Sequence, residues 1–150
     1  MPDDGPDDVP MCRWPRVGVI PGARECLAAL FGRVPLCVAT NAAASTRSMV
    51  EQALDRVDLL RFIAELFCVA DQGYRKSHPE FWRAVRRRLG EPLEQVVMIG
   101  DSLEHDVLAP RRFGLQTVWF NTRGTNFEAP PEVPTVTRLE DLPTMIMAAR

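Results

Sequence analysis

The chain has 150 residues, of which 46% are hydrophobic and 25% are charged, and its formal net charge is −2. This size suits one domain with a buried core, and this charge gives no general attraction to nucleic acid or to an anionic membrane. No apolar run is long enough to span a membrane and no secretory signal is visible, so we expect a cytoplasmic location.

The chain begins with residues 1–15, which are rich in proline and aspartate and show no apolar periodicity. This composition predicts a loose or disordered arm, and we expect residues 16–150 to form the core domain. Apolar residues at helical spacing then predict a helix from Gly22 to about Gly32. Further on, strands are expected at 36–39, 66–70, 96–99, 116–120 and 135–137, and helices at 45–55, 79–89, 103–113 and 139–149. Strands that alternate with helices in this way predict an α/β fold with a mainly parallel sheet.

Basic residues are almost all arginine, since Lys76 is the only lysine among 18 basic residues. A lysine kept at one position suggests that its compact ammonium group binds a phosphate or a carboxylate as a point charge. Chance in an arginine-biased composition explains the single lysine equally well. Four arginines lie on the expected helix 79–89, away from its apolar side, and we interpret them as a solvated face rather than a nucleic-acid patch. They are Arg83, Arg86, Arg87 and Arg88.

The four cysteines form no CxxC pair, so reduced thiols are expected rather than disulfides or a zinc site.

Polar side chains stand where several expected elements meet. Thr40 and Asn41 follow the strand 36–39, where a hydroxyl and backbone N–H groups can hold an anion. Asp101 follows the strand 96–99, and Asp106 comes five residues later, which suits a hard cation such as magnesium. A plainer interpretation makes Asp101 a helix cap and Asp106 a solvated surface acid. With Lys76 ahead of a helix start, the set indicates phosphoryl chemistry at one edge of the sheet.

These segments together resemble the haloacid dehalogenase (HAD) superfamily, in its phosphoglycolate phosphatase-like branch. Residues 36–41, ending in Thr40-Asn41, resemble its second motif, and residues 75–81 resemble its third, with Ser77 in place of a proline. Residues 100–106 resemble its fourth motif, and the resemblance covers about residues 17–143. It implies a three-layer α/β/α Rossmann-like core with a mainly parallel sheet. It also implies that Thr40, Asn41 and Lys76 bind phosphate, with Thr40 and Lys76 catalytic, and that Asp101 and Asp106 hold or orient Mg²⁺.

The first motif of that family, Asp-x-Asp with the nucleophilic aspartate, is not found in this sequence. The strand and cap that accompany it are therefore expected to be missing too. The only nearby apolar run, residues 17–20, is short and contains glycine, so we expect it to connect to the first helix and not to form a central strand. Three explanations stay open, in this order: an N-terminally truncated chain, a degenerate family member, or a separate chain that donates the strand. Exposed strand edges would also favour self-association.

We therefore expect a magnesium-dependent, phosphatase-type hydrolase of a small phosphorylated metabolite, truncated or catalytically impaired. The alternative is a non-catalytic module that binds phosphate or a partner and keeps the HAD fold. A dehalogenase is less favoured, because the paired acids suit a metal-using relative. Pro110 lies within the expected helix 103–113 and should kink it. Such a kink would change the direction in which the Asp106 side chain points.

Overall fold

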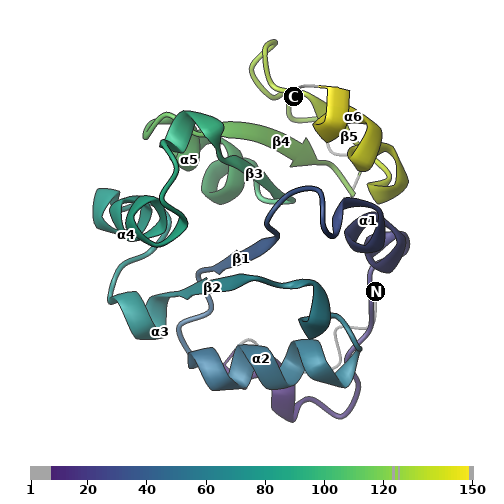
Figure 1. Cartoon of the computed structure of the whole chain (residues 1–150), viewed down its shortest axis with the longest axis vertical. Coiled ribbons are helices and arrows are strands. Elements are labelled where there is room, and N and C mark those ends of the chain that lie inside the picture. The colour runs from purple at the N-terminus through teal and green to yellow at the C-terminus, as the bar shows by residue number, and fades with distance from the viewer. Residues whose placement is uncertain (1–7, 123, 125, 149–150) are drawn as a thin grey trace. The chain divides into compact units, whose positions relative to one another are not determined.

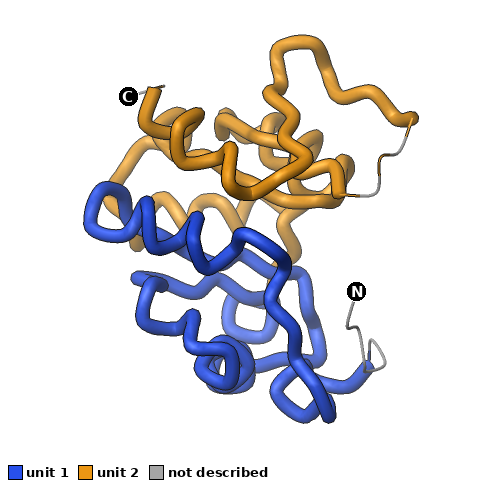
Figure 2. Tube along the Cα trace, turned by 90° about the vertical axis from the view of Figure 1, so that its right-hand side faces the viewer, with its two compact units in different colours: residues 1–73 blue, residues 74–150 orange. Residues whose placement is uncertain are grey.

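A computed structural model describes residues 8–122, 124 and 126–148 of the chain. The chain divides into two compact units, residues 1–73 and residues 74–150, which Figure 2 shows in separate colours. Each unit contains its own parallel sheet, and the two are described separately.

The first unit is built on a two-stranded parallel sheet. Strand β1 pairs with β2 in a register that places Cys37 beside Glu65 and Thr40 beside Cys68. Buried side chains such as Leu30, Phe62 and Phe67 come from several of its elements. Its elements are α1 (Ala23–Leu30), β1 (Cys37–Thr40), α2 (Arg47–Arg56), β2 (Glu65–Cys68) and α3 (Val69–Gln72), with 3-10 helices at Met11–Arg13 and Leu60–Phe62.

The start of the described chain is held against α2. The guanidinium of Arg56 donates to the backbone carbonyls of Cys12, Trp14 and Pro15, at 3.0, 2.7 and 3.3 Å. In the described part of the predicted arm, residues 8–15, three carbonyl groups thus bind an exposed guanidinium of α2. The rest of the predicted arm, residues 1–7, lies outside the described residues.

The second unit is built on a three-stranded sheet in the order β3-β4-β5, with both strand pairs parallel (Figure 1). Its buried side chains include Phe81 and Trp82 of α4 and Val118 and Trp119 of β4. Its elements are α4 (Pro79–Leu89), β3 (Val97–Gly100), a π-helix (Leu103–Leu108), α5 (Ala109–Arg111), β4 (Gln116–Phe120), β5 (Thr135–Val136) and α6 (Leu142–Ala148), with 3-10 helices at Leu93–Gln95 and Leu139–Asp141.

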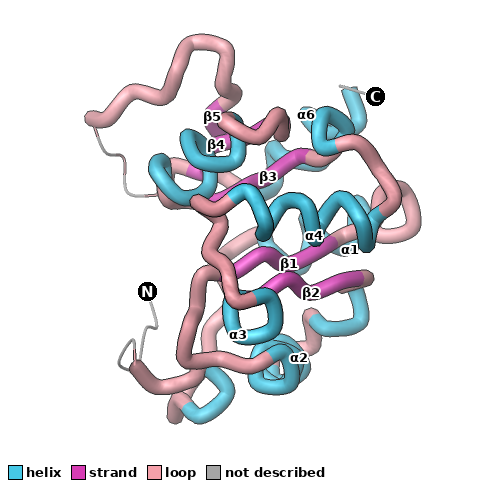
Figure 3. Tube along the Cα trace, turned by 90° about the vertical axis from the view of Figure 1, so that its left-hand side faces the viewer, coloured by secondary structure: helices cyan, strands magenta, loops and turns pink. Residues whose placement is uncertain are grey.

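Most of the predicted elements are confirmed, and the differences have local causes. The strand expected at 66–70 ends at Cys68, and Val69 begins the short helix α3, as Figure 3 shows. The helix expected at 103–113 is split into a π-helix and α5. The segment 17–20 forms no strand and has a single bridging residue, Val17, as expected for a link. The closing helix begins with a 3-10 turn, and Ala149 lies outside the described residues.

None of the four cysteines is in a disulfide. Within the part of the chain that is described, every helix is too short or too polar to cross a membrane.

Candidate active site

The residues that sequence analysis selects fall in both units. Thr40 and Asn41 belong to the first unit, and Lys76, Asp101 and Asp106 belong to the second. The two groups are therefore built up separately, each from the elements of its own unit.

Thr40 is the last residue of β1, and its side chain organises the turn that follows. Its Oγ1 accepts a hydrogen bond from the backbone N–H of Ala42 at 3.0 Å. The hydroxyl proton is not used in that contact, so Thr40 can still donate to a ligand oxygen. Asn41 follows it and is half-buried. The first strand thus ends in a turn with a hydroxyl donor, which fits an anion contact.

Cys68 lies beside Thr40 in the register of the two strands. Its side chain is buried, with 1% of the residue exposed. Burial raises the pKa of the Cys68 thiol, and the negative charge of Asp71 acts in the same direction. Because the thiolate is the nucleophilic form, Cys68 is a poor substitute for a nucleophilic aspartate at neutral pH.

Lys76 occupies a buried position in the loop that leads into α4. Only 6% of the residue is exposed, and its backbone carbonyl accepts a hydrogen bond from the indole Nε1–H of Trp82 at 2.7 Å. Trp82 is itself 2% exposed, so the loop is fixed by a contact inside the core. The backbone at Lys76 is therefore held in place by the first turn of the following helix, which Pro79 begins.

Asp106 forms a buried ion pair with Lys76. The Lys76 ammonium donates to Oδ1 of Asp106, and both side chains are 8% exposed. The second oxygen, Oδ2, accepts from the backbone N–H of Ser102 at 3.1 Å. Both oxygens of this carboxylate are thus engaged within the unit. A buried charge requires such pairing, since an unpaired ion in this position would carry a large desolvation penalty.

Gly100, the last residue of β3, makes room for the Asp106 carboxylate. A Cβ atom built on Gly100 would overlap Oδ2, Cγ and Cβ of Asp106. Its backbone angle lies outside the left-handed region, so the glycine is required by this close approach. This role of Gly100 could not be predicted from the sequence, because only the fold brings residue 106 back over residue 100.

The segment that carries Asp106 is a π-helix and not a regular α-helix. Ser102 caps its start by accepting from the N–H of His105 at 3.2 Å, and the N–H of Ala109 donates to the carbonyl of Glu104, five residues earlier. Pro110, which is fully buried, has no N–H to continue the α-helical spacing. The predicted disturbance of this helix is therefore confirmed, and it takes the form of a wider turn at Asp106.

Asp101 follows β3 and is exposed, unlike Asp106. Its backbone carbonyl accepts from the indole Nε1–H of Trp119 in β4 at 3.1 Å, which fixes the chain at the end of the sheet. Within the described residues, no group of three or more histidine, cysteine, aspartate or glutamate side chains is placed to hold a metal. Magnesium commonly uses one or two protein carboxylates together with water and substrate phosphate, so Asp101 fits such a site as a ligand and Asp106 as a positioning group.

The structure thus brings Lys76 and Asp106 together, and it leaves Asp101 on the surface at the end of β3. The contacts that fix the pair were not expected from the sequence. The indole of Trp82 and the backbone of Ser102 are examples, and the only available signal was that a buried tryptophan needs a partner for its N–H.

The chain is similar in sequence to a known family of hydrolases and to several of its relatives. The family model of haloacid dehalogenase-like hydrolases matches residues 15–114. The HAD-hydrolase named YfnB of Bacillus subtilis is 28% identical over 127 residues, covering 83% of this chain and 52% of YfnB. Glyceraldehyde 3-phosphate phosphatase of Pyrococcus furiosus is 28% identical over 65 residues, covering 43% of this chain and 27% of that enzyme. Pyrimidine 5′-nucleotidase YjjG of Escherichia coli is 27% identical over 103 residues, covering 68% of this chain and 44% of that enzyme.

Solved structures give the same result for the fold. The crystal structure of YfnB bound to magnesium matches with a TM-score of 0.74 and 26% sequence identity, covering 85% of this chain and 55% of that one. The predicted fold class, a three-layer α/β/α Rossmann-like core with a mainly parallel sheet, is confirmed. The chain spans about half the length of YfnB and less than half of the other two relatives.

Proposed function

This chain belongs to the haloacid dehalogenase-like hydrolase family, and we propose that it acts as a magnesium-dependent, phosphatase-type hydrolase with impaired turnover. The observation that supports this most strongly is the buried Lys76–Asp106 ion pair at the carboxyl end of β3. Asp101 follows the same strand and offers an exposed carboxylate. A fixed cation beside a carboxylate suits a reaction in which the protein positions a phosphoryl group and neutralises its charge.

Each residue has a role in this proposal. Asp101 binds Mg²⁺, and Asp106 positions Lys76 and the end of β3. Lys76 supplies positive charge toward the phosphate, and Thr40 and Asn41 contribute hydrogen bonds from the end of β1. When bound, Mg²⁺ would neutralise phosphate oxygens as a Lewis acid.

The proposed substrate is a small phosphorylated metabolite. The names of two relatives, a glyceraldehyde 3-phosphate phosphatase and a pyrimidine 5′-nucleotidase, support this class. A cytoplasmic location remains part of the proposal. No nucleic-acid or membrane partner is included, because the net charge of −2 supplies no general attraction to either.

The test is hydrolysis of p-nitrophenyl phosphate by the 150-residue chain with and without magnesium. We expect slow turnover that requires magnesium and is lost in Asp101→Asn. The exposed Glu104→Gln, which changes a carboxylate in the same segment, is the matched control and should keep the activity. Turnover equal to the background at high protein concentration would reject the enzymatic function for this chain.

A second candidate function is a non-catalytic module that binds phosphate or a partner. The observation that favours it is the lack of any Asp-x-Asp in the sequence, since such a pair supplies the nucleophile in the resembled family. It predicts binding of magnesium or phosphate without turnover. Calorimetric titration that detects neither ligand would reject this function too.

A strand-donating partner or self-association is also proposed. In the described residues β1 and β3 each have one neighbour in their sheets, so each strand could accept another. Size-exclusion chromatography should then show a species larger than 16.8 kDa. A monomer that unfolds cooperatively at all concentrations would contradict the self-association.

A further inference from the structure

The outer side of α4 carries a concentration of positive charge that the proposed function does not use. The inner side of this helix is formed by Phe81, Trp82 and Val85, all at most 2% exposed. On the other side Arg83, Arg86 and Arg87 are exposed, and Arg86 and Arg87 stand three and four residues after Arg83. These three arginines therefore form one face of the helix, which we call the arginine face.

Protein carboxylates neutralise the arginine face only in part. Arg83 pairs with Glu80 one turn earlier. Among residues 8–122, 124 and 126–148, no carboxylate lies within ion-pair reach of Arg86 or Arg87. Like charges three and four residues apart on a helix repel one another, and the C-terminal end of the helix dipole offsets this only partly. A bound anion would remove the repulsion.

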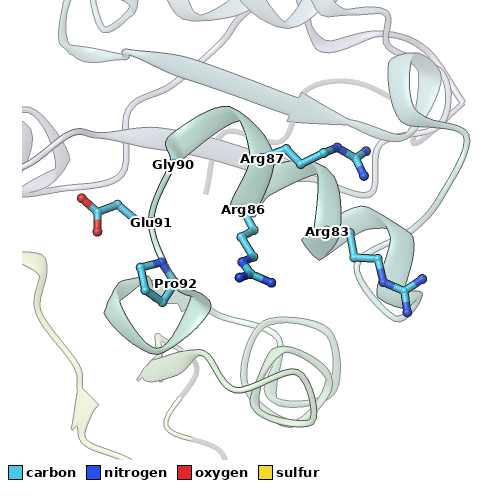
Figure 4. A pocket seen from close by; sticks show the side chains of 6 residues that line it. All are labelled: Arg83, Arg86, Arg87, Gly90, Glu91 and Pro92. Carbon is cyan, nitrogen blue, oxygen red and sulfur yellow. The ribbon is translucent and has the colours of Figure 1, made fainter.

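The arginine face borders a hollow of about 580 Å³, lined by Arg83, Arg86, Arg87, Gly90, Glu91 and Pro92. Figure 4 shows Arg83 and Arg86 pointing to the same side of the helix and Arg87 extending in another direction, while the carboxylate of Glu91 lies away from all three. The volume lies in the range of about 300–1,000 Å³ that is common for small-molecule sites. Three guanidinium groups and one carboxylate, that of Glu91, therefore line the hollow, and positive charge is in excess there.

We propose that the arginine face binds a small ligand with two or more linked phosphate groups, such as inorganic triphosphate or a nucleoside triphosphate. Guanidinium groups bind phosphate oxygens through paired N–H donors, which one ammonium cannot reproduce. The three arginines spread over one helical turn, about 6 Å along the axis, so linked phosphates can meet more than one of them.

This site is separate from the candidate active site. Lys76 precedes the first turn of α4, whereas the hollow is lined by residues from Arg83 onward and by the turn that follows the helix. The Lys76 ammonium is buried and held by Asp106, whereas the three guanidinium groups of the arginine face are exposed, so the two sets of cations are presented separately. Binding at the arginine face should therefore not depend on Asp101 or Lys76.

The test is calorimetric titration of the full chain with inorganic triphosphate in magnesium-free buffer. We expect binding that weakens as salt is added and that is about tenfold or more weaker in the triple variant Arg83→Gln/Arg86→Gln/Arg87→Gln. The matched control is Arg33→Gln/Arg112→Gln/Arg138→Gln, which removes three positive charges from other exposed positions and should bind within about twofold of the unmodified chain. Circular dichroism melting verifies that both variants are folded, and Arg87→Gln alone replaces the triple variant if it is not.

Other outcomes would overturn the proposal. Equal weakening in the two triple variants would show a general charge effect. A loss of triphosphate binding in Asp101→Asn would place the ligand at the candidate active site. Tighter binding of a single-stranded oligonucleotide than of triphosphate, removed by the same triple variant, would make the arginine face a nucleic-acid surface. Lack of detectable binding by the unmodified chain would leave a solvated helix face.

Discussion

The two ends of α4 present positive charge in opposite ways. Ahead of its first turn, Lys76 is 6% exposed and is paired with Asp106. Toward its C-terminal end, Arg86 and Arg87 are exposed and reach no carboxylate in the described part of the chain. A buried cation depends on its partner for stability, whereas exposed cations are solvated and remain available to a ligand. Positive charge is therefore buried and paired at one end of α4, and exposed at the other.

The largest effect is expected for Asp106→Ala. This change leaves the Lys76 ammonium buried without its carboxylate and removes the acceptor for the Ser102 N–H. We expect a loss of about 3–5 kcal/mol in the free energy of unfolding, measured by urea denaturation. The exposed pair Arg112–Glu104 provides the control, and Glu104→Ala should cost less than about 1 kcal/mol.

A double variant separates the charge effect from simple damage to the core. Lys76→Met/Asp106→Leu removes both charges and fills the space with apolar groups, so it should recover part of the stability that Asp106→Ala loses. If the double variant is less stable than Asp106→Ala, the uncompensated lysine is not the cause of the loss.

A smaller effect is expected for Gly100→Ala. The added methyl group would overlap the Asp106 carboxylate, which must then move away from Lys76 or displace β3. We expect a cost of about 1–3 kcal/mol in thermal or urea unfolding, as for other overpacked sites. Gly18→Ala is the control, since Gly18 is exposed and its φ is not positive. Equal stability of Gly100→Ala and the unmodified chain would mean that Asp106 does not lie over residue 100.

The smallest effect, with the opposite sign, is expected for Arg87→Gln. It removes a like charge four residues from Arg83, so the free energy of unfolding should rise by about 0.2–0.5 kcal/mol at low ionic strength. The gain should shrink when salt is added, because exposed charges are screened. A loss of more than about 1 kcal/mol would show that Arg87 has a partner and would remove the contrast between the two ends of α4.

Local signals in the sequence predicted much of the fold. Pro79 at the first helical position and Gly90 in the left-handed conformation fix both ends of α4, which matches its predicted range. The end of β2 was less predictable, because Val69 and Ala70 continue the apolar run although the backbone turns into α3. Proline at position 110 predicted a disturbed helix, but not that the disturbance would be a π-helix at Asp106.

The candidate site was predictable in its residue types more than in its contacts. Lys76 and Asp106 were both selected, and their ion pair depends on a fold that brings together residues 30 positions apart. Their partners, the Trp82 indole and the Ser102 N–H, have no signature in the sequence. The contrast between buried Asp106 and exposed Asp101 was also beyond the sequence, because burial depends on the packing of the π-helix over β3.

The most direct test of the proposed site is calorimetric titration of the chain with inorganic phosphate in the presence and absence of magnesium. We predict phosphate binding that requires magnesium and is weakened about tenfold or more in Asp101→Asn, while Arg87→Gln leaves it unchanged. Binding that is equal in both variants, or no heat with either ligand, would contradict a magnesium- and phosphate-binding site at the end of β3.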